Sequence, residues 1–417
     1  MKEKRARRRP ELHGCRRILR LSGIALLLVC STCSLYFFVP SIYYSFPVQK
    51  LLEDIHLVSN ILNRAEKESD MIAFSCRHRY GWGSSLYSVH PDGSNLRLLR
   101  ESPSQAHAGL SWSPNGNWIA FHTRVSSYYW SFSRHWSYEG GTPEIYRIRF
   151  DGSISKRLTY NDDREKIPKW SKGGKHIFYA FGGLRRISIL TGEIRVIYDQ
   201  LFRIYDLTSD GSTVAFVGHF ESSASPSGAD KRGNRNEKLI PYAIYRMNAD
   251  GSGLRLLKYL DDSVYGMQWS PDNSFLLYHR YNGRPFVLNV RTLEEVHAPA
   301  MRTLRAKWSP DSRWLAIIGE GGTYREGDEW HRTSDYERDS SSQIDNLYLL
   351  DFETGEVEDI IDDVNASGLA WSPDSEWIAF SRPAYLGQLY KIRRDGTDLQ
   401  QLTNLECGVL EASWSPK

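Results

Sequence analysis

Two histidines occupy equivalent places in the chain, and histidine is the side chain best suited to proton transfer near neutral pH. His122 follows the apolar triplet Ile-Ala-Phe, and His279 follows the triplet Leu-Leu-Tyr. Arg280 comes directly after His279, and Arg382 stands at the matching place after a third triplet. These four residues are the candidates for a catalytic site. The alternative is that the two histidines end their strands and hydrogen-bond to neighbouring repeats.

Other kinds of chemistry have little support in the sequence. It contains no Gly-x-Ser-x-Gly nucleophile motif and leaves no room for a hydrolase domain after the last repeat. Its Cys and His residues show no metal-ligand spacing, so we expect no metal and no cofactor. No carboxylate or tyrosine completes a mechanism around the histidines. A binding or scaffold role is therefore favoured over catalysis, and a polysaccharide lyase-like or other carbohydrate-active enzyme is the alternative.

Three long insertions carry residues that suit recognition. They span residues 122–143, 218–241 and 319–345, and the second is a serine-rich polar segment. The first and third are rich in large aromatic side chains, which supply contact area for a sugar or a protein. The predicted binding residues are Tyr128, Tyr129, Trp130, Trp136, Tyr324, Trp330 and His331. The alternative is that these side chains pack onto the body of the domain.

A sevenfold repeat must position these insertions. Apolar triplets recur seven times, and six of them follow a turn such as Trp-Ser-Pro-Asp at residues 371–374. Pro presets the backbone of such a turn, and Asp can accept a hydrogen bond from it. After each triplet, a third strand ends in a second turn, mostly Asp-Gly or Thr-Gly. Spacings of 37–43 residues between some successive Trp positions fit one four-stranded propeller blade.

The two ends of the repeat predict how it closes. The first triplet, at residues 72–74, has no turn before it, and the last turn, at Trp414, has no triplet after it. If residues 410–415 supply the inner strand of the first blade, the chain forms an all-β, seven-bladed β-propeller without exposed sheet edges. The insertions then fall in blades two, four and six, on the face opposite the Ser-Pro-Asp and Asp-Gly turns.

The combination of these motifs resembles the TolB-type family of β-propeller repeats over residues 69–417. The resemblance implies the fold, but it does not imply one function. Similar repeats occur in periplasmic binding proteins, in the lids of prolyl-peptidase-like enzymes and in some polysaccharide lyases. The lyases use His and Arg in their active sites. For the alternative function, the resemblance therefore implies a catalytic role for His122, His279, Arg280 and Arg382.

The N-terminal segment predicts a membrane anchor. Residues 1–20 carry a net charge of +7, which leaves −4 for residues 21–417, so nucleic acid is not an expected partner. Residues 21–47 are uncharged and long enough to cross a bilayer as a helix. The positive-inside rule places the N-terminus in the cytoplasm and the propeller outside it. A cleaved signal peptide is the alternative. Residues 48–68 predict an amphipathic stalk helix, with a partner-binding helix as the second reading.

Cys76 and Cys407 are the two cysteines expected on the exported side. Cys76 ends the second strand of the first blade, and Cys407 precedes the strand that is expected to pair with it. They could form a disulfide in an oxidising compartment, or they could be two independent buried thiols. The expected partners are an envelope protein or a glycan and, through the N-terminal helix, the membrane. The expected location is the cell membrane, with a single span.

Overall fold

The described part of the computed structural model lies within the unit Ser69–Lys417. The described residues are 70–79, 83–125, 142–161, 165–200, 202–219, 242–260, 264–280, 285–296, 303–320, 323–326, 329–332, 345–382 and 387–416. All of their regular elements are β-strands. The predicted tail 1–20, anchor 21–47 and stalk 48–68 lie outside the described residues. Within the described ranges, no helix is long and apolar enough to cross a membrane.

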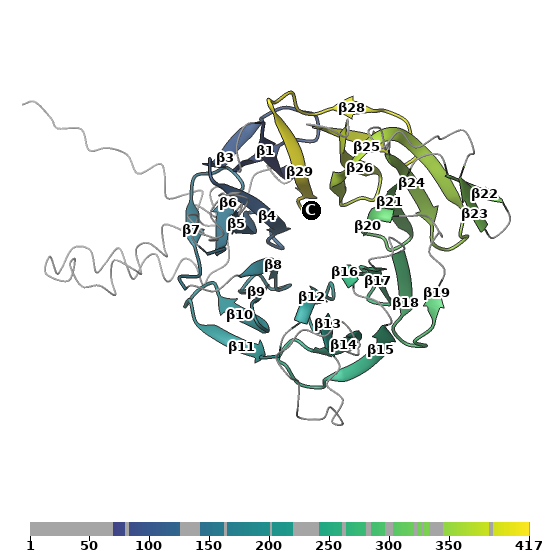
Figure 1. The fold of residues 1–417 in the computed structure, drawn as a ribbon. Helices are drawn as coiled ribbons and strands as arrows, with labels where there is room; N and C mark the ends of the chain where they lie inside the picture. Colours follow the sequence, from purple (N-terminus) through teal and green to yellow (C-terminus); the bar gives the residue numbers. More distant parts are fainter. Residues whose placement is uncertain are drawn as a thin grey trace, which may run out of the picture. The chain divides into compact units, whose positions relative to one another are not determined.

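The described strands form a seven-bladed β-propeller around a common axis, as the sequence predicts (Figure 1). Each blade is an antiparallel sheet of four strands, which are named below in order from the axis outward. Blade one contains β29 (Cys407–Trp414), β1 (Ile72–His78), β2 (Ser84–Val89) and β3 (Arg97–Ser102). Blade two contains β4 (Gln105–Trp112), β5 (Trp118–Val125), β6 (Ile145–Arg149) and β7 (Ser155–Arg157). Blade three contains β8 (Lys166–Trp170), β9 (His176–Ala180), β10 (Leu184–Ser188) and β11 (Ile194–Tyr198).

The other four blades follow the same order. Blade four contains β12 (Phe202–Leu207), β13 (Thr213–His219), β14 (Tyr242–Asn248) and β15 (Arg255–Leu260). Blade five contains β16 (Val264–Trp269), β17 (Phe275–Arg280), β18 (Pro285–Asn289) and β19 (Glu295–Val296). Blade six contains β20 (Thr303–Trp308), β21 (Trp314–Glu320), β24 (Asp345–Asp351) and the first half of β25 (Val357–Trp371). Blade seven contains the second half of β25, then β26 (Trp377–Arg382), β27 (Gln388–Arg393) and β28 (Gln400–Gln401).

The core lies between neighbouring blades, because each sheet is covered on both faces. The triplets supply much of it: Ile119 and Phe121 of blade two pack in one cluster with Ala73 and Leu86 of blade one. The aromatic residue that ends most triplets is almost fully buried, as in Phe74, Phe121, Tyr179, Phe216, Tyr278 and Phe380. Burying such large apolar side chains on both sheet faces is the main stabilising contribution of the ring.

The Ser-Pro-Asp turns are stabilised by their own side chains. In blade seven, Ser372 Oγ accepts a hydrogen bond from Trp377 N at 2.9 Å and donates one to Asp374 Oδ1 at 2.5 Å. Ser270 and Asp272 repeat this arrangement in blade five. Each turn therefore provides the backbone donor and acceptor partners that the first and second strands need where they join.

The ring closes where the sequence predicts. The inner strand β29 pairs with β1, from Ile72 opposite Trp414 to His78 opposite Cys407. Cys76 and Cys407 form a disulfide that joins positions 331 residues apart, with Cα atoms separated by 5.5 Å. The closing strand thus attaches the C-terminal end of the repeat to blade one by a backbone ladder and by a covalent bond.

One insertion contains regular structure that the sequence analysis did not predict. Between β21 and β24, β22 (Thr323–Glu326) and β23 (Glu329–Arg332) form a two-stranded antiparallel hairpin. The third insertion is therefore not a structureless loop over its whole length.

Candidate functional site

The propeller has two different faces. The turns between first and second strands and between third and fourth strands lie on one face, which we call the turn-bearing face. The connections β5–β6, β13–β14 and β21–β24 lie on the other, together with the connections from one blade to the next; this is the loop-rich face. Since antiparallel strands alternate in direction, all three long insertions begin and end on the loop-rich face.

The inner strands place two layers of residues near the axis. The first of these layers, the axial layer, consists of the residue immediately before the Trp position of each blade. Its members are Ser111, Lys169, Asp206, Gln268, Lys307, Ala370 and Ser413. The second layer, two residues earlier, consists of Gly109, Ile167, Ile204, Gly266, Arg305, Gly368 and Glu411. Because Trp ends the inner strand, the axial layer lies towards the turn-bearing face.

Tryptophan side chains fix the backbone of the axial layer. Trp170 Nε1 donates to Ser111 O at 3.0 Å, and Trp112 Nε1 donates to Ser413 O at 2.9 Å. Trp371 Nε1 donates to Lys307 O at 3.0 Å in the same way. In each case the indole of one blade binds the carbonyl of the axial residue in the preceding blade. At these three interfaces the Trp fixes the axial residue of the preceding blade, whereas Trp269 Nε1 and Trp308 Nε1 have no hydrogen-bond partner among the described residues.

The carboxylates near the axis are held by backbone amides. Glu411 accepts hydrogen bonds from Gly109 N at 2.8 Å and Leu110 N at 3.1 Å. Asp206 accepts one from Trp269 N at 2.8 Å, and its second oxygen lies 2.8 Å from Lys169 Nζ. Both carboxylates thus connect one blade to another.

Lys307 differs from these paired residues. Burial lowers its pKa from the ordinary 10.5 to about 8, and the positive charges of Lys169 and Arg305 act in the same direction. The negative charges of Glu411 and Asp206 oppose this shift. The Lys307 amine consequently carries a proton that is easier to remove than that of a surface lysine.

The wall of the axis is irregular and, at one position, strained. Each of the seven inner strands has a register shift in its pairing with the second strand. In the second layer Gly109 and Gly368 take positive φ at their bulges, but in blade three the same place is held by Ile167 with φ of 56°. A β-branched residue in that conformation is strained. Tyr205 holds it there by donating from its hydroxyl to Ile167 O at 2.6 Å.

The two candidate catalytic histidines are buried between blades. His122 is 7% exposed and His279 is 6% exposed. Each ring packs against the second-layer glycine of its own blade. A Cβ atom added at Gly109 would lie 2.7 Å from the His122 ring, and one added at Gly266 would lie 3.0 Å from the His279 ring. Burial lowers the pKa of His279 to about 4, and the neighbouring cations Arg305 and Lys307 add to this effect. His279 is therefore neutral at pH 7.

The structure places the four candidate catalytic residues in three blades. His279 and Arg280 are neighbours on β17 of blade five, whereas His122 belongs to blade two and Arg382 to blade seven. Arg280 stacks over the ring of Phe286 at 3.9 Å and pairs with Glu295 at 3.2 Å. Its guanidinium is thus already used inside blade five.

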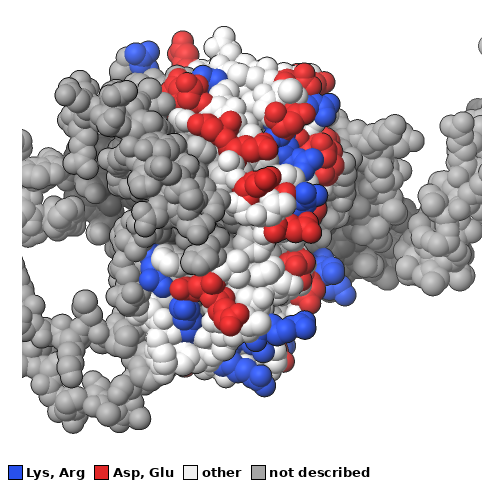
Figure 2. Space-filling view, turned by 90° about the vertical axis from the view of Figure 1, so that its right-hand side faces the viewer, with Lys and Arg blue, Asp and Glu red and all other residues white. Residues whose placement is uncertain are grey.

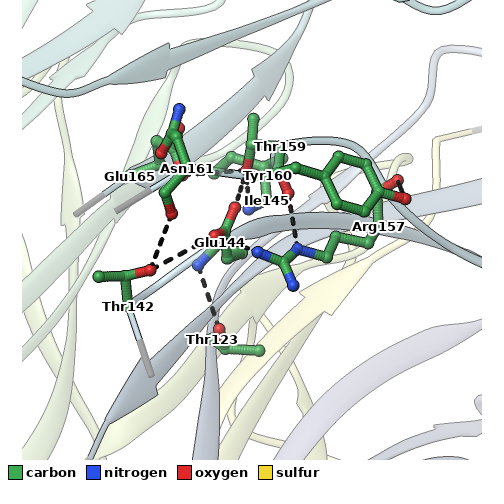
Figure 3. Close-up of polar contacts among 9 residues, drawn as sticks. All are labelled: Thr123, Thr142, Glu144, Ile145, Arg157, Thr159, Tyr160, Asn161 and Glu165. Carbon is green, nitrogen blue, oxygen red and sulfur yellow. Dashed lines mark hydrogen bonds and ion pairs between the residues drawn. The ribbon is translucent and has the colours of Figure 1, made fainter. Parts of the chain in front are cut away.

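A buried polar cluster holds the end of the first insertion (Figure 3). Thr159 accepts a hydrogen bond from Ile145 N at 2.9 Å, and its hydroxyl lies 2.6 Å from Glu144 and 2.9 Å from Glu165. Arg157 forms an ion pair with Glu144. Both carboxylates are at most 3% exposed. The cluster ties β6, the outer strand β7 and the connection to blade three together just after the insertion.

A pocket opens on the loop-rich face at the ring closure. It has a volume of about 640 Å³ and is lined by His78, Tyr87, Glu101, Glu406 and the disulfide-bonded Cys407, among others. His78 Nε2 lies 2.8 Å from Ser85 Oγ at its edge. Its lining includes groups of both charges as well as an aromatic ring.

Most of the predicted binding residues lie outside the described part of the chain. This is true of Tyr128, Tyr129, Trp130 and Trp136 in the first insertion. The other three lie on the β22–β23 hairpin, where Tyr324 is opposite His331 and Trp330 is opposite Arg325. Over the described part of the surface seen in Figure 2, basic and acidic side chains are interspersed, so charge of one sign is not gathered there.

The sequence analysis did not identify Lys169, Asp206, Arg305, Lys307 or Glu411. A signal was available, because alignment of the Trp positions shows that the residue before Trp is Lys, Asp or Gln in four blades. Whether such a residue faces the axis depends on the bulge in each inner strand, and the sequence does not show these bulges.

Comparison with known proteins supports the fold alone. No protein-family model and no curated protein matches the chain. An oligogalacturonate lyase from Vibrio parahaemolyticus is 13% identical, with TM-score 0.52 over 80% of this chain and 86% of the other. The propeller domain of the Trilobed protease from Pyrococcus furiosus is 12% identical, with TM-score 0.53 over 81% of this chain and 93% of the other. TolB from Acinetobacter baumannii is 16% identical, with TM-score 0.49 over 87% and 72%.

The two likenesses with TM-scores above 0.5 agree with the β-propeller fold. Another oligogalacturonate lyase structure, with TM-score 0.53 and 14% identity over 80% of this chain and 85% of the other, is a complex with manganese. Within the described ranges of the present chain, no group of three or more His, Cys, Asp or Glu is placed to hold a metal ion.

Proposed function

We propose that this chain is a recognition module that binds an envelope protein or a glycan on its loop-rich face. The observation that carries the proposal is that all three long insertions begin and end on this one face. Loops that project from a rigid β scaffold are common binding elements. The pocket of about 640 Å³ opens on the same face and adds a concave surface to it.

Two features favour a binding surface that is organised before the partner arrives. The buried cluster around Thr159 fixes the end of the first insertion, and the β22–β23 hairpin orders part of the third. Binding elements that are already ordered lose less conformational entropy on association. The cluster and the hairpin therefore support recognition by the aromatic residues of these insertions.

We further propose that the propeller is extracytoplasmic and is held to the cell membrane by residues 21–47. The charge pattern of residues 1–47 is the basis for this orientation. The disulfide between Cys76 and Cys407 supports it, since such bonds persist in oxidising compartments. A reporter that is active only outside the cytoplasm, fused after Lys417, should be active; activity of a cytoplasm-only reporter there would reverse the orientation.

The recognition proposal is tested by changing Trp130, Trp136 and Trp330 together to Ala. Capture of the partner from the native envelope, or of a glycan, should be lost, because Trp side chains often dominate binding energy. The melting temperature should remain nearly unchanged. If the triple variant unfolds, the aromatics have a packing role; if it binds normally, the recognition site is elsewhere.

A matched control changes the turn-bearing face. Asp92→Asn and Asp395→Asn alter exposed carboxylates that accept hydrogen bonds within their own turns. This double variant should capture the partner as well as the wild-type chain does. Loss of binding in the control would show that the turn-bearing face takes part in recognition.

A carbohydrate-active enzyme is the second candidate function. It is favoured by the position of His279 beside the axial cations Arg305 and Lys307. Depolymerisation of an acidic glycan by the wild-type chain, lost in the His122→Gln/His279→Gln variant, would support this function. If the wild-type chain has no such activity, recognition remains the proposed function.

A further inference from the structure

Positive charge exceeds negative charge at the axis of the ring. In the axial layer and the second layer, the charged residues are the cations Lys169, Arg305 and Lys307 and the anions Asp206 and Glu411. Since lysine, arginine and both carboxylates are charged at pH 7, these two layers together carry one uncompensated positive charge.

The two carboxylates are already engaged. Asp206 is only 5% exposed and is shared between Lys169 and the backbone of blade five. Glu411 uses both oxygens on two amides of blade two. Their negative charges are therefore shared with these groups and offset the positive charge of Lys307 only in part.

Arg305 and Lys307 are the residues left with an unmet charge. Among the described residues, no hydrogen bond or ion pair involves the side chain of either one. They lie two residues apart on β20, so their Cα atoms are on the same side of the strand at the axis. Both keep part of their surface exposed, whereas Ala306 and Trp308 beside them are buried. Part of each residue is thus accessible to solvent, although the Lys307 amine is buried enough to lower its pKa to about 8.

We propose that the carboxylate group of a small ligand binds to Arg305 and Lys307 at the axis of the ring. The planar guanidinium can offer two parallel N–H donors to a carboxylate, and the ammonium adds a third. One carboxylate supplies the single negative charge that the two layers lack. A phosphate dianion would instead leave the axis with excess negative charge.

This site goes beyond the proposed recognition surface and does not depend on it. Its residues belong to an inner strand, and Lys307 lies next to the last residue of that strand, towards the turn-bearing face. The aromatic insertions begin and end on the opposite face. Loss of the axial site and loss of partner capture can therefore be measured separately in the same variants.

The test measures the melting temperature of the full chain while acetate is added at constant ionic strength, with chloride as the reference anion. Acetate should raise the melting temperature, because a ligand that binds only the folded state stabilises it. In Lys307→Met the apparent affinity for acetate should fall by about tenfold or more, as expected for loss of a charge-assisted hydrogen bond. Arg305→Met, as a second variant, should show the same loss if Lys307→Met does not fold.

Two controls decide the outcome. Lys156→Met removes an exposed lysine on the outer strand of blade two and should leave the acetate response unchanged. Inorganic phosphate at pH 7 should stabilise the wild-type chain less than acetate does. An unchanged response in both Lys307→Met and Arg305→Met, or an equal loss in Lys156→Met, would overturn the site. A larger response to phosphate would overturn the single-carboxylate assignment.

Discussion

The polar cluster of blade two and the axial layer both bring cations close to carboxylates, but they resolve the charges differently. In the cluster, Arg157 pairs with Glu144, and Thr159 lies within hydrogen-bond distance of both buried carboxylates. At the axis, Asp206 and Glu411 are engaged by backbone amides while Arg305 and Lys307 keep their charge uncompensated. A polar network whose groups contact one another stabilises the fold, whereas unmet charge that solvent can reach is available to a ligand.

Burial explains why the two regions differ. Glu144 is almost inaccessible to solvent, and its charge is paired with Arg157, because an unpaired charge there would be costly. The axial cations remain partly exposed, which makes their unmet charge tolerable. The Trp indoles hold the strands in place through the carbonyls, so the axial side chains are not needed to join blades in every repeat. They are therefore free to differ from blade to blade.

The largest effect is expected in the cluster. Thr159→Val keeps the shape of the side chain but leaves Ile145 N and the two carboxylates without the hydroxyl. The free energy of unfolding should fall by about 3–5 kcal/mol, measured by urea denaturation. Thr397→Val is the matched control, because this threonine lies in an exposed turn and its hydroxyl donates to Asp395 of the same turn. It should cost about 0.5 kcal/mol or less; equal losses would remove the contrast between a buried network and a surface turn.

A pH titration tests the lowered pKa of His279, the buried residue beside Arg305 and Lys307. The pKa of His279 is about 4 in the folded chain against an ordinary 6.5, so the unfolded chain binds more protons between these values. Stability should therefore fall as pH decreases from about 6.5 to 4, by about 2–3 kcal/mol for this group. His279→Gln should show a correspondingly weaker dependence in denaturation curves. If both proteins lose stability in parallel, burial does not lower the pKa of His279 in the folded chain.

The number of blades was predictable from the sequence because its signals are local. Ser372 and Asp374 stabilise their turn within a few residues, and the triplet that follows is buried on both faces. The closing strand was predictable as well, since Trp414 lacks a triplet after it. The β22–β23 hairpin was missed, although a Gly-Asp pair separates two short segments there.

The site was less predictable because it depends on backbone irregularity. The alternation of polar and apolar residues along Thr303–Trp308 does not reveal that the pairing of β20 with β21 shifts register between Thr303 and Arg305. It also does not show that Glu411 is already used by Gly109 and Leu110 of another blade. Which charged side chains lack an oppositely charged partner is decided only in the assembled ring. Sequence spacing could align the residues before Trp, but it could not identify which of them lack a partner.

The smallest expected effect concerns Lys307 itself. Its pKa is about 8 in the folded chain against an ordinary 10.5, so below pH 8 both states hold the proton and the cost of burying the charge is fully present. Between about pH 8 and 10.5 the unfolded chain binds more protons, and the wild-type chain should gain stability relative to Lys307→Met. Because the side chain is partly exposed, the gain should be about 1–2 kcal/mol. Saturating acetate should reduce it, since a bound carboxylate favours the protonated amine and raises its pKa. If acetate leaves the gain unchanged, the carboxylate does not bind next to Lys307. The axial layer would then have only a structural role, like the polar cluster of blade two.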